Sequence, residues 1–327
     1  MNVRLTQLDG KLPNLALMKL AHFHRSKGDT VTFSRRVHRD MFEPDYDRVY
    51  GSAIFAFSTR RLEAFQKEWP EAIVGGTGTT SLQTVEQVLG DEHEFYDYSD
   101  YPKFPFSIGF TQRGCRLRCK FCVVPAKEGK PRSVNSINDI WRGDPHPRKL
   151  MLLDNDFFGQ DQWRKRIEEI RAGAFKICLN QGINVRLIND EAAEALATID
   201  YRDDSFTNKR VYTAWDNLGD EKIFFRGMDT LERAGIPGKS VMAYMLIGYK
   251  PDETMDEILY RFNRMVERGI LPYPMVFNNA RRDLKRFQRW AVRGFYRVTP
   301  WDARVRRFSE QQMEQTRNAG MFTEAPQ

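Results

Sequence analysis

The feature that most constrains this chain is a cluster of three of its four cysteines, Cys115, Cys119 and Cys122, spaced Cys-x3-Cys-x2-Cys. The cluster directly follows residues 106–110, an apolar run that is typical of a strand. Three cysteine thiolates can hold three irons of a four-iron cluster and leave the fourth open to a small molecule, whereas four would close it. A structural zinc site is the alternative, but zinc prefers four protein ligands, so Cys178 or a distant His would have to complete it.

With an aromatic residue, Phe121, just before the last cysteine, this spacing resembles that of the radical S-adenosylmethionine (SAM) superfamily. The resemblance implies that a 4Fe–4S cluster on Cys115, Cys119 and Cys122 binds SAM at its open iron and passes one electron to it. SAM is then cleaved to a 5′-deoxyadenosyl radical, which abstracts hydrogen from a substrate. The resemblance also implies an electron donor such as a flavodoxin or a ferredoxin, and a Phe121 side chain that packs against adenine or shields the cluster from water.

Candidate strands and helices alternate from residue 106 onward and predict an α/β fold with a parallel sheet. The candidate strands are 106–110, 149–153, 175–179, 210–214, 241–247 and 273–277, and the candidate helices include 160–171, 190–198, 222–234 and 255–268. Six such units fit a partial (β/α)6 TIM-like barrel, which is the radical SAM core and here covers residues 99–280. The active site of such a barrel lies at the carboxyl ends of its strands.

Polar residues and glycines follow several of these strands. The resemblance implies that they contact SAM, and the candidates, together with the aromatic of the cysteine loop, are Phe121, Asp154, Asn155, Gln181, Arg186, Gly248 and Tyr249. The acidic group near SAM's amino group is Asp154 or Asp156, unless these carboxylates cap the following helix. The guanidinium of Arg186 can form two parallel hydrogen bonds with the SAM carboxylate. The alternative role for Arg186 is a surface ion pair. No catalytic residue is assigned beyond the three cluster cysteines.

Residues 1–98 show the same alternation of strands and helices and predict a doubly wound, Rossmann-type domain with a parallel sheet. The opening strand, the helix start at Pro13-Asn14 and the segment 74–76 resemble the cobalamin-binding-like domain that precedes many radical SAM cores. The family's cobalt-ligand signature, Asp-x-His-x-x-Gly, is absent, because Lys11 stands where the His would follow Asp9. The resemblance therefore implies no His-ligated cobalamin and leaves cobalamin a doubtful cofactor.

Other features of the first hundred or so residues exclude some kinds of site. The loop Gly75–Gly78 lacks the Lys of a P-loop, and Ser81 replaces the third Gly of a dinucleotide fingerprint, which favours a tight turn over a phosphate site. Residues 1–114 contain no cysteine, which excludes the second cluster of methylthiotransferases. The polar, Pro-bearing segment 97–105 is predicted to link the two parts.

Cysteine usage and hydropathy predict where the protein works. Four cysteines, three of them clustered, argue against a disulfide framework and fit a reducing compartment. The N-terminus lacks a secretory-signal pattern, and no apolar run approaches the roughly 18 residues of a membrane span. We therefore expect a soluble cytoplasmic protein with no membrane partner.

The positive charge is concentrated in a C-terminal helical extension, residues 281–327. Its segment Arg281–Arg307 carries ten Lys or Arg and two Asp, which accounts for the whole net charge of +7. Five aromatic residues are interleaved with these cations, a composition typical of nucleic-acid-binding surfaces. The alternative is an amphipathic helix that buries its aromatic stripe and closes the barrel. A non-catalytic iron–sulfur or zinc protein that binds nucleic acid through this tail is the alternative function.

Overall fold

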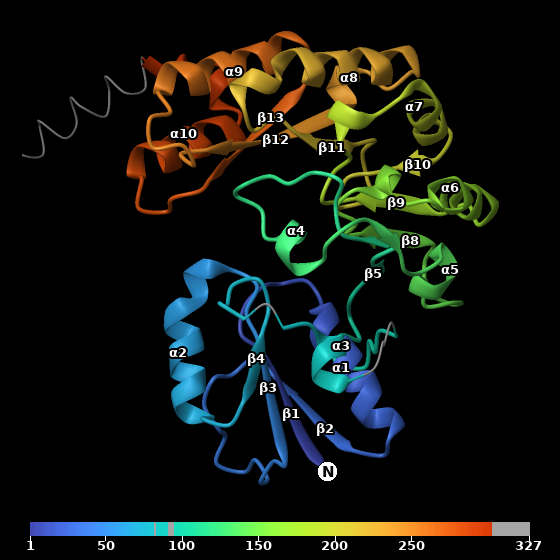
Figure 1. Cartoon of the computed structure of the whole chain (residues 1–327), viewed down its shortest axis with the longest axis vertical. Helices are drawn as coiled ribbons and strands as arrows, with labels where there is room; N and C mark the ends of the chain where they lie inside the picture. Colours follow the sequence, from blue (N-terminus) through green and yellow to red (C-terminus); the bar gives the residue numbers. More distant parts are fainter. Residues whose placement is uncertain (82, 91–94, 303–327) are drawn as a thin grey trace, which may run out of the picture. The chain divides into compact units, whose positions relative to one another are not determined.

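The computed structural model describes residues 1–81, 83–90 and 95–302. The chain forms two compact units (Figure 1): the first comprises Met1–Asn184 and Ile188–Val211, and the second comprises Val185–Leu187 and the chain from Tyr212 onward. Both units combine helices with parallel strands, so the predicted α/β class is confirmed. The domain boundaries predicted after residues 98 and 280 stay predictions.

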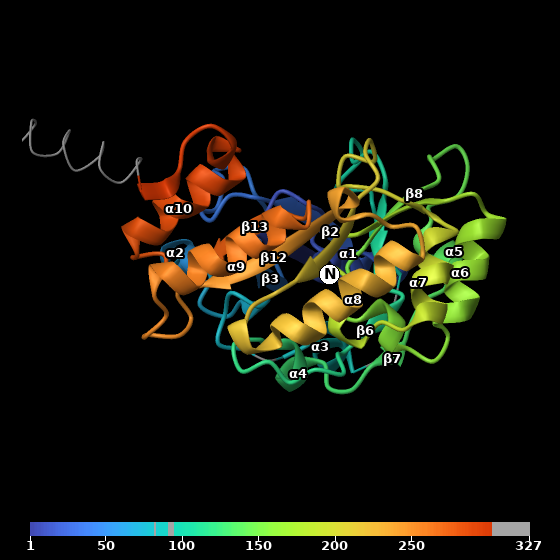
Figure 2. The same cartoon turned by 90° about the horizontal axis from the view of Figure 1, so that it is seen from above.

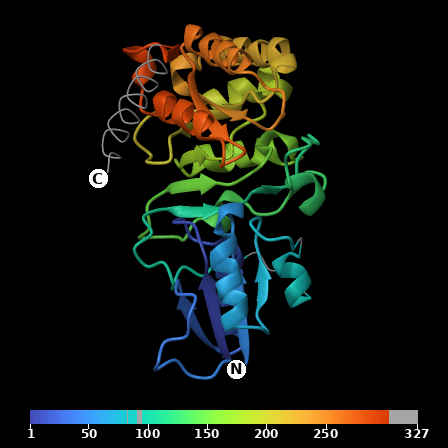
Figure 3. The same cartoon turned by 90° about the vertical axis from the view of Figure 1, so that its left-hand side faces the viewer.

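The first sheet has the strand order β2-β1-β3-β4, and all of its neighbours are parallel. Its elements are β1 (Asn2–Gln7), α1 (Leu15–Ser26), β2 (Thr30–Ser34), β3 (Arg48–Ser52), α2 (Thr59–Glu68), β4 (Ile73–Gly75) and α3 (Val85–Leu89). Helix α2 covers one face, where Phe65 packs with Leu8 and Ala53. Helices α1 and α3 cover the other face, where Leu17 and Leu20 pack against Tyr50 (Figures 1 and 3).

Capping explains where α1 begins, and a side-chain carboxylate explains where β3 stops. The Asn14 side chain accepts a hydrogen bond from the Leu17 N–H at 3.2 Å, as expected for a helix N-cap. The sequence predicts a strand over 49–57, but β3 ends at Ser52. The Asp9 carboxylate accepts the backbone N–H groups of Ile54 and Phe55 at 2.8 and 2.9 Å, so these groups do not extend the ladder.

The second sheet of the first unit has the order β10-β9-β8-β5 and is also parallel. Its strands and helices are β5 (Ser107–Gly109), α5 (Ile137–Ile140), β8 (Lys149–Leu152), α6 (Trp163–Ala172), β9 (Lys176–Leu179), α7 (Asp190–Ala197) and β10 (Asp200–Tyr201). Between β5 and α5 lies the cysteine segment, flanked by a short antiparallel pair, β6 (Gln112–Arg113) and β7 (Arg132–Ser133), and by α4 (Val124–Lys127).

The second unit contains a sheet of order β11-β12-β13, in which β12 and β13 are parallel. Its elements are β11 (Val211–Ala214), α8 (Glu221–Arg233), β12 (Val241–Ile247), α9 (Met255–Glu267), β13 (Leu271–Val276) and α10 (Arg282–Val292). Alternate residues of β12 are buried, and α8 and α9 lie beside the sheet (Figure 2). No helix in the described part of the chain is long and apolar enough to cross a membrane.

Candidate metal centre

The three clustered cysteines lie on a loop that follows β5 and β6. All three are partly exposed, and the Cys122 N–H donates to the Cys119 carbonyl at 3.0 Å in a tight turn. Burial raises the pKa of the Cys115 thiol, and Asp156, Cys119 and Cys122 raise it further. Within residues 1–81, 83–90 and 95–302, no three His, Cys, Asp or Glu side chains converge as a ready-made metal site.

Gly114, at the start of this loop, has no room for a side chain. Its φ is +82°, and an added Cβ would lie 2.2 Å from the Lys130 carbonyl oxygen. Its N–H donates to the Glu128 Oε2 atom at 2.9 Å, and Arg113 forms an ion pair with Glu128 Oε1 at 2.9 Å. One carboxylate therefore fixes the backbone immediately before Cys115.

Asp154 is a predicted SAM contact, but its carboxylate already accepts hydrogen bonds from other residues of the chain. It is 2% exposed, and its Oδ1 atom accepts the Thr111 and Gln112 N–H groups at 2.7 and 3.2 Å. Its Oδ2 atom accepts the Thr111 hydroxyl. Burial raises the pKa of Asp154 to about 7, although these hydrogen bonds favour the charged form. The carboxylate thus joins the end of β8 to the start of β6.

Asp156 holds the cysteine loop itself. Its side chain is fully buried, and it pairs with the Arg116 Nε atom at 2.7 Å, with a second bond from the same guanidinium at 2.9 Å. The Arg116 backbone N–H donates to it at 3.2 Å. The Asp156 N–H in turn donates to Gln112 Oε1 at 3.0 Å. Neither Asp154 nor Asp156 caps α6, whose N-cap is Gln162.

The remaining predicted residues of the first unit lie in different settings. Phe121 is half-buried within the loop. Asn155 donates from its side chain to Glu128 Oε2 at 3.0 Å, so it belongs to the same network as Gly114. Gln181 is exposed after β9. Cys178 is fully buried on β9, and burial raises the pKa of its thiol to about 12.

Of the predicted residues in the second unit, Gly248 and Tyr249 follow β12, whereas Arg186 lies in the turn Val185–Leu187 after β9. Arg186 pairs with Asp220 at 2.7 Å, which is the ion pair that the sequence left open as its alternative role. The Gly248 N–H, just after β12, donates to Glu253 Oε2 at 2.6 Å, and Gly248 has a φ of +75°. The Tyr249 ring packs edge-on against Phe277.

Arg261 is a structural residue that the sequence did not reveal. It lies on α9, is 1% exposed, and donates to the carbonyl oxygens of Trp215, Asp216 and Leu246 at 2.9 to 3.1 Å. It also pairs with Glu253. Because Glu253 accepts the Gly248 N–H as well, one buried ion pair holds the carboxyl ends of β11 and β12 together. Gln112, Arg116 and Glu128 were missed in the same way.

Two histidines of α1 are already engaged by neighbouring side chains. His24 is buried, with its ring nitrogens 2.7 Å from Asp29 Oδ2 and 3.1 Å from the Tyr50 hydroxyl. His22 stacks on Phe95. In the glycine loop, a Cβ at Gly76 would lie 2.1 Å from the Ala53 carbonyl oxygen, which supports the prediction of a tight turn.

The described part of the basic tail contains an amphipathic helix, α10. Helix α10 buries Leu284, Phe287, Trp290 and Ala291, so Phe287 and Trp290 are not available for base stacking. Its exposed face carries the cations Arg282, Lys285 and Arg289, followed by Arg293. Among the described residues none of these four forms an ion pair, whereas Arg164 on α6 and Arg264 on α9 are paired with carboxylates. Arg304, Arg306 and Arg307 lie outside the described residues.

Comparison of the chain with protein-family models, with curated proteins and with solved structures finds no match.

Proposed function

We propose that this chain is a radical SAM enzyme that holds a 4Fe–4S cluster on Cys115, Cys119 and Cys122. The observation that carries the proposal is the cysteine loop with its supports. Three partly exposed thiols share a short loop, and buried carboxylates fix the backbone on which that loop is built. A partly exposed loop that is held by several buried polar side chains is typical of a functional site. A loop that serves only to pack against the core does not need such support.

The donor set fits this cluster better than it fits structural zinc. Three thiols are close in sequence, and the fourth cysteine, Cys178, is buried on a strand with a strongly raised pKa. A thiol must lose its proton to bind a metal, so Cys178 is a poor ligand. Zinc would need a fourth ligand from elsewhere. When bound, the cluster would supply one electron for reductive cleavage of SAM, delivered by a donor such as a flavodoxin or a ferredoxin.

The chain's own residues position this loop. Glu128 holds the Gly114 N–H, and Asp156 holds both the backbone and the guanidinium of Arg116, so the segment is fixed on either side of Cys115. Asp154 anchors the residues just before it. We therefore assign Asp154 and Asp156 positioning roles, with any contact to SAM made through neighbouring groups.

For SAM itself we propose contacts with Phe121, Asn155 and Gln181 of the first unit, and with Arg186, Gly248 and Tyr249 of the second. These contacts require that β5, β8, β9, β11, β12 and β13 form the six strands of a partial (β/α)6 TIM-like barrel. Supporting this, the predicted residues follow the carboxyl ends of their strands, which is where barrel enzymes place their active sites. In the second unit, Arg261 fixes two of these strand ends.

The decisive experiment is anaerobic reconstitution with iron and sulfide, followed by dithionite and SAM and analysis of the products. A radical SAM enzyme yields 5′-deoxyadenosine and methionine, and the Cys119→Ala protein yields neither. A wild-type protein that binds iron and sulfide but leaves SAM intact contradicts the proposal. That outcome favours the alternative, a non-catalytic iron–sulfur or zinc protein that binds nucleic acid.

The cations on α10 favour nucleic acid as the substrate class or the partner. Arg282, Lys285 and Arg289 lie at i, i+3 and i+7 and share the exposed face of the helix. Because they have no ion pairs within the described part of the chain, their charge is available to phosphates. With Phe287 and Trp290 buried, this surface binds by charge and not by stacking on these rings.

A further inference from the structure

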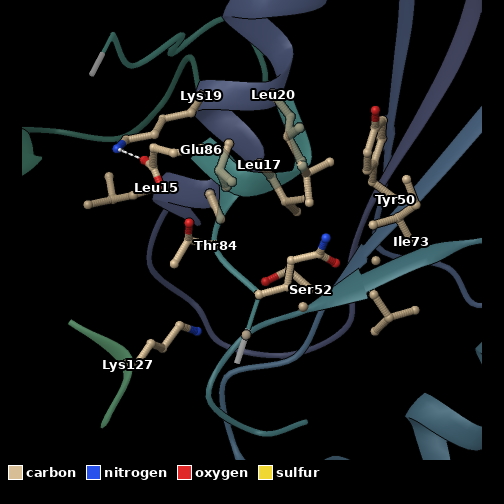
Figure 4. A pocket seen from close by; sticks show the side chains of 18 of the residues that line it. Leu15, Leu17, Lys19, Leu20, Tyr50, Ser52, Ile73, Thr84, Glu86 and Lys127 are labelled. Carbon is tan, nitrogen blue, oxygen red and sulfur yellow. Dashed lines mark hydrogen bonds and ion pairs between the residues drawn. The ribbon is translucent and has the colours of Figure 1, made fainter. Parts of the chain in front are cut away.

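A pocket of about 120 Å³ lies on the first sheet, between α1 and α3 and over β3 and β4 (Figure 4). Most of its wall is apolar and is formed by Leu15, Leu17, Leu20, Ile73, Val85 and Val88. This volume is close to that of apolar cavities of about 150 Å³ that stay dry and bind benzene. The pocket therefore suits an apolar group of about the size of one six-membered ring.

A glycine on β4, Gly75, lines the pocket and leaves its space unfilled. On β4, Ile73 faces α1 and Val74 faces α2, so Gly75 faces α1 again. A Cβ at Gly75 would meet only the Gln83 carbonyl oxygen, at 3.9 Å. Among the described residues, nothing in the packing there excludes a side chain. The neighbouring Gly76, in contrast, is required by its close approach to Ala53.

One edge of the pocket is cationic. Lys127, at the end of α4, reaches toward the hollow opposite Ser52 and Thr84 (Figure 4), and Arg113 also lines it. Lys127 is half-buried, and in the part of the chain that the structure describes its ammonium makes no hydrogen bond or ion pair. Burial lowers the pKa of Lys127, and Arg113 lowers it further. A half-buried cation without an acceptor favours an anionic ligand.

The other charges at the pocket are already balanced. Lys19 pairs with Glu86 at 2.8 Å, so this pair brings no net charge. Arg113 pairs with Glu128, but its buried Nε atom has no partner in the described structure. The uncompensated positive charge thus lies on the Lys127 side, next to an apolar hollow.

We propose that this pocket binds a small carboxylate that carries an aromatic ring or a short branched alkyl group. The carboxylate bonds to Lys127, with Arg113 beside it, and the apolar group fills the space over Gly75 between α1 and α3. None of the residues of this site is a proposed cluster or SAM ligand, so ligand binding can be measured without the radical chemistry.

Benzoate tests the proposal, with benzamide as its uncharged counterpart and inorganic phosphate as an anion without an apolar part. Binding to the full-length protein is measured by calorimetry and by saturation-transfer NMR. For so small a ligand we expect a dissociation constant on the order of 1 mM. Benzamide should bind about tenfold more weakly, which corresponds to loss of one charge-assisted contact. Phosphate should not compete at concentrations equal to those of benzoate.

Two variants test separately how the charge of Lys127 and the cavity over Gly75 contribute to binding. Lys127→Met keeps the length of the side chain and should bring benzoate down to the affinity of benzamide, whereas Lys103→Met, at an exposed lysine away from the pocket, should change nothing. Gly75→Val fills the hollow with a residue that suits a strand and should abolish binding of both ligands.

Three results would overturn the proposal: no benzoate binding by the wild type at about 10 mM, equal benzoate affinity in the Lys127→Met protein, or effective competition by phosphate. Benzoate binding by a folded Gly75→Val protein would do the same. A melting curve establishes the folding of each variant, and Lys127→Met decides the question if Gly75→Val does not fold.

Discussion

Arg116 and Asp156 form a forked ion pair in which the guanidinium lies in the cysteine loop and the buried carboxylate lies just after β8. The loop has no helix or strand of its own between Cys115 and Cys122. Its conformation therefore depends on side chains that come from elsewhere in the first unit. Removing these side chains should affect the cluster before it affects the fold.

Asp156→Asn should weaken cluster incorporation and lower the free energy of unfolding by about 1–3 kcal/mol, because Arg116 loses its charged acceptor. The control is Glu191→Gln, which breaks the exposed pair with Arg164 and should cost less than about 1 kcal/mol. Iron and sulfide content and urea denaturation measure the two effects. Full iron content in the Asp156→Asn protein would remove this residue from the support of the loop.

Two glycines of the cysteine segment offer a matched comparison. Gly114 and Gly129 both have positive φ, +82° and +73°, so Ala at either position costs about 1–2 kcal/mol in backbone strain. Only Gly114→Ala adds a clash, with the Lys130 carbonyl oxygen, while the space around Gly129 is open. We expect Gly114→Ala to lose most of its cluster and Gly129→Ala to keep it. Similar iron content in both variants would show that the close approach at Gly114 does not matter for the loop.

The cluster ligands themselves give the sharpest spectroscopic test. Replacing Cys115, Cys119 or Cys122 by Ala should abolish the 4Fe–4S signal in absorption and electron paramagnetic resonance spectra. Cys178→Ala should keep it, because Cys178 is buried on β9 and its pKa is raised to about 12. A full cluster in the Cys119→Ala protein, or its loss in Cys178→Ala, would contradict the ligand assignment.

Asp154 predicts a specific pH dependence of stability. In the unfolded chain this carboxyl ionises near its ordinary pKa of 3.8, but in the folded protein burial raises the pKa to about 7. The folded state therefore binds one proton more than the unfolded state between these values. The contribution of protonated Asp154 to stability is complete below pH 4 and is lost as the pH rises through about 7. The free energy of unfolding then falls with a slope of up to about 1.4 kcal/mol per pH unit.

Asp154→Asn should flatten this slope, because Asn does not ionise. The readout is the difference in free energy of unfolding between wild type and variant from pH 4 to pH 8, in which the other carboxylates cancel. The nearby Arg113 is retained in both proteins and opposes the rise in the pKa. A constant difference across this range would mean that the hydrogen bonds from Thr111 and Gln112 keep Asp154 ionised.

The sequence predicted the regular elements well because their signals are periodic. The predicted strand 241–247 coincides with β12, and the predicted helix 255–268 differs from α9 by one residue. The two-residue strands β6, β7 and β10 were missed, because so short a segment has no periodicity. The sequence also offered the alternative that the tail is an amphipathic helix with its aromatic side chains buried. The burial of Phe287 and Trp290 on α10 agrees with that alternative.

The supports of the site could not be predicted, because they depend on side-chain contacts between residues that are far apart in the sequence. Asp156 meets Arg116 across a separation of forty residues, and Glu128 meets Gly114 across fourteen. No local pattern marks either partner. Arg261 looks like an ordinary cation on a helix surface, yet it is buried against the carbonyl oxygens at two strand ends. Its role is visible only in the folded second unit.

The last prediction concerns α10. If its exposed cations bind a phosphate backbone, the affinity for single-stranded RNA should fall with salt, because each neutralised phosphate releases counterions. Three engaged cations give a slope of log affinity against log salt of about −2, at about −0.7 for each contact. Replacing Arg282, Lys285 and Arg289 together by Gln should flatten the slope by about this amount and leave substrate-free SAM cleavage unchanged.

A matched triple variant on α2, with Arg60, Arg61 and Lys67 replaced by Gln, removes the same charge from another exposed helix face, and these cations also form no ion pair among the described residues. It should keep the wild-type slope, because what matters is where the charge lies and not only how much of it there is. Melting curves of both triple variants establish that they are folded; the α10 changes leave Leu284, Phe287 and Trp290 in place. If the α10 variant keeps the wild-type affinity and slope, or if both variants lose them equally, the α10 cations are an ordinary solvated face and the substrate must be sought elsewhere.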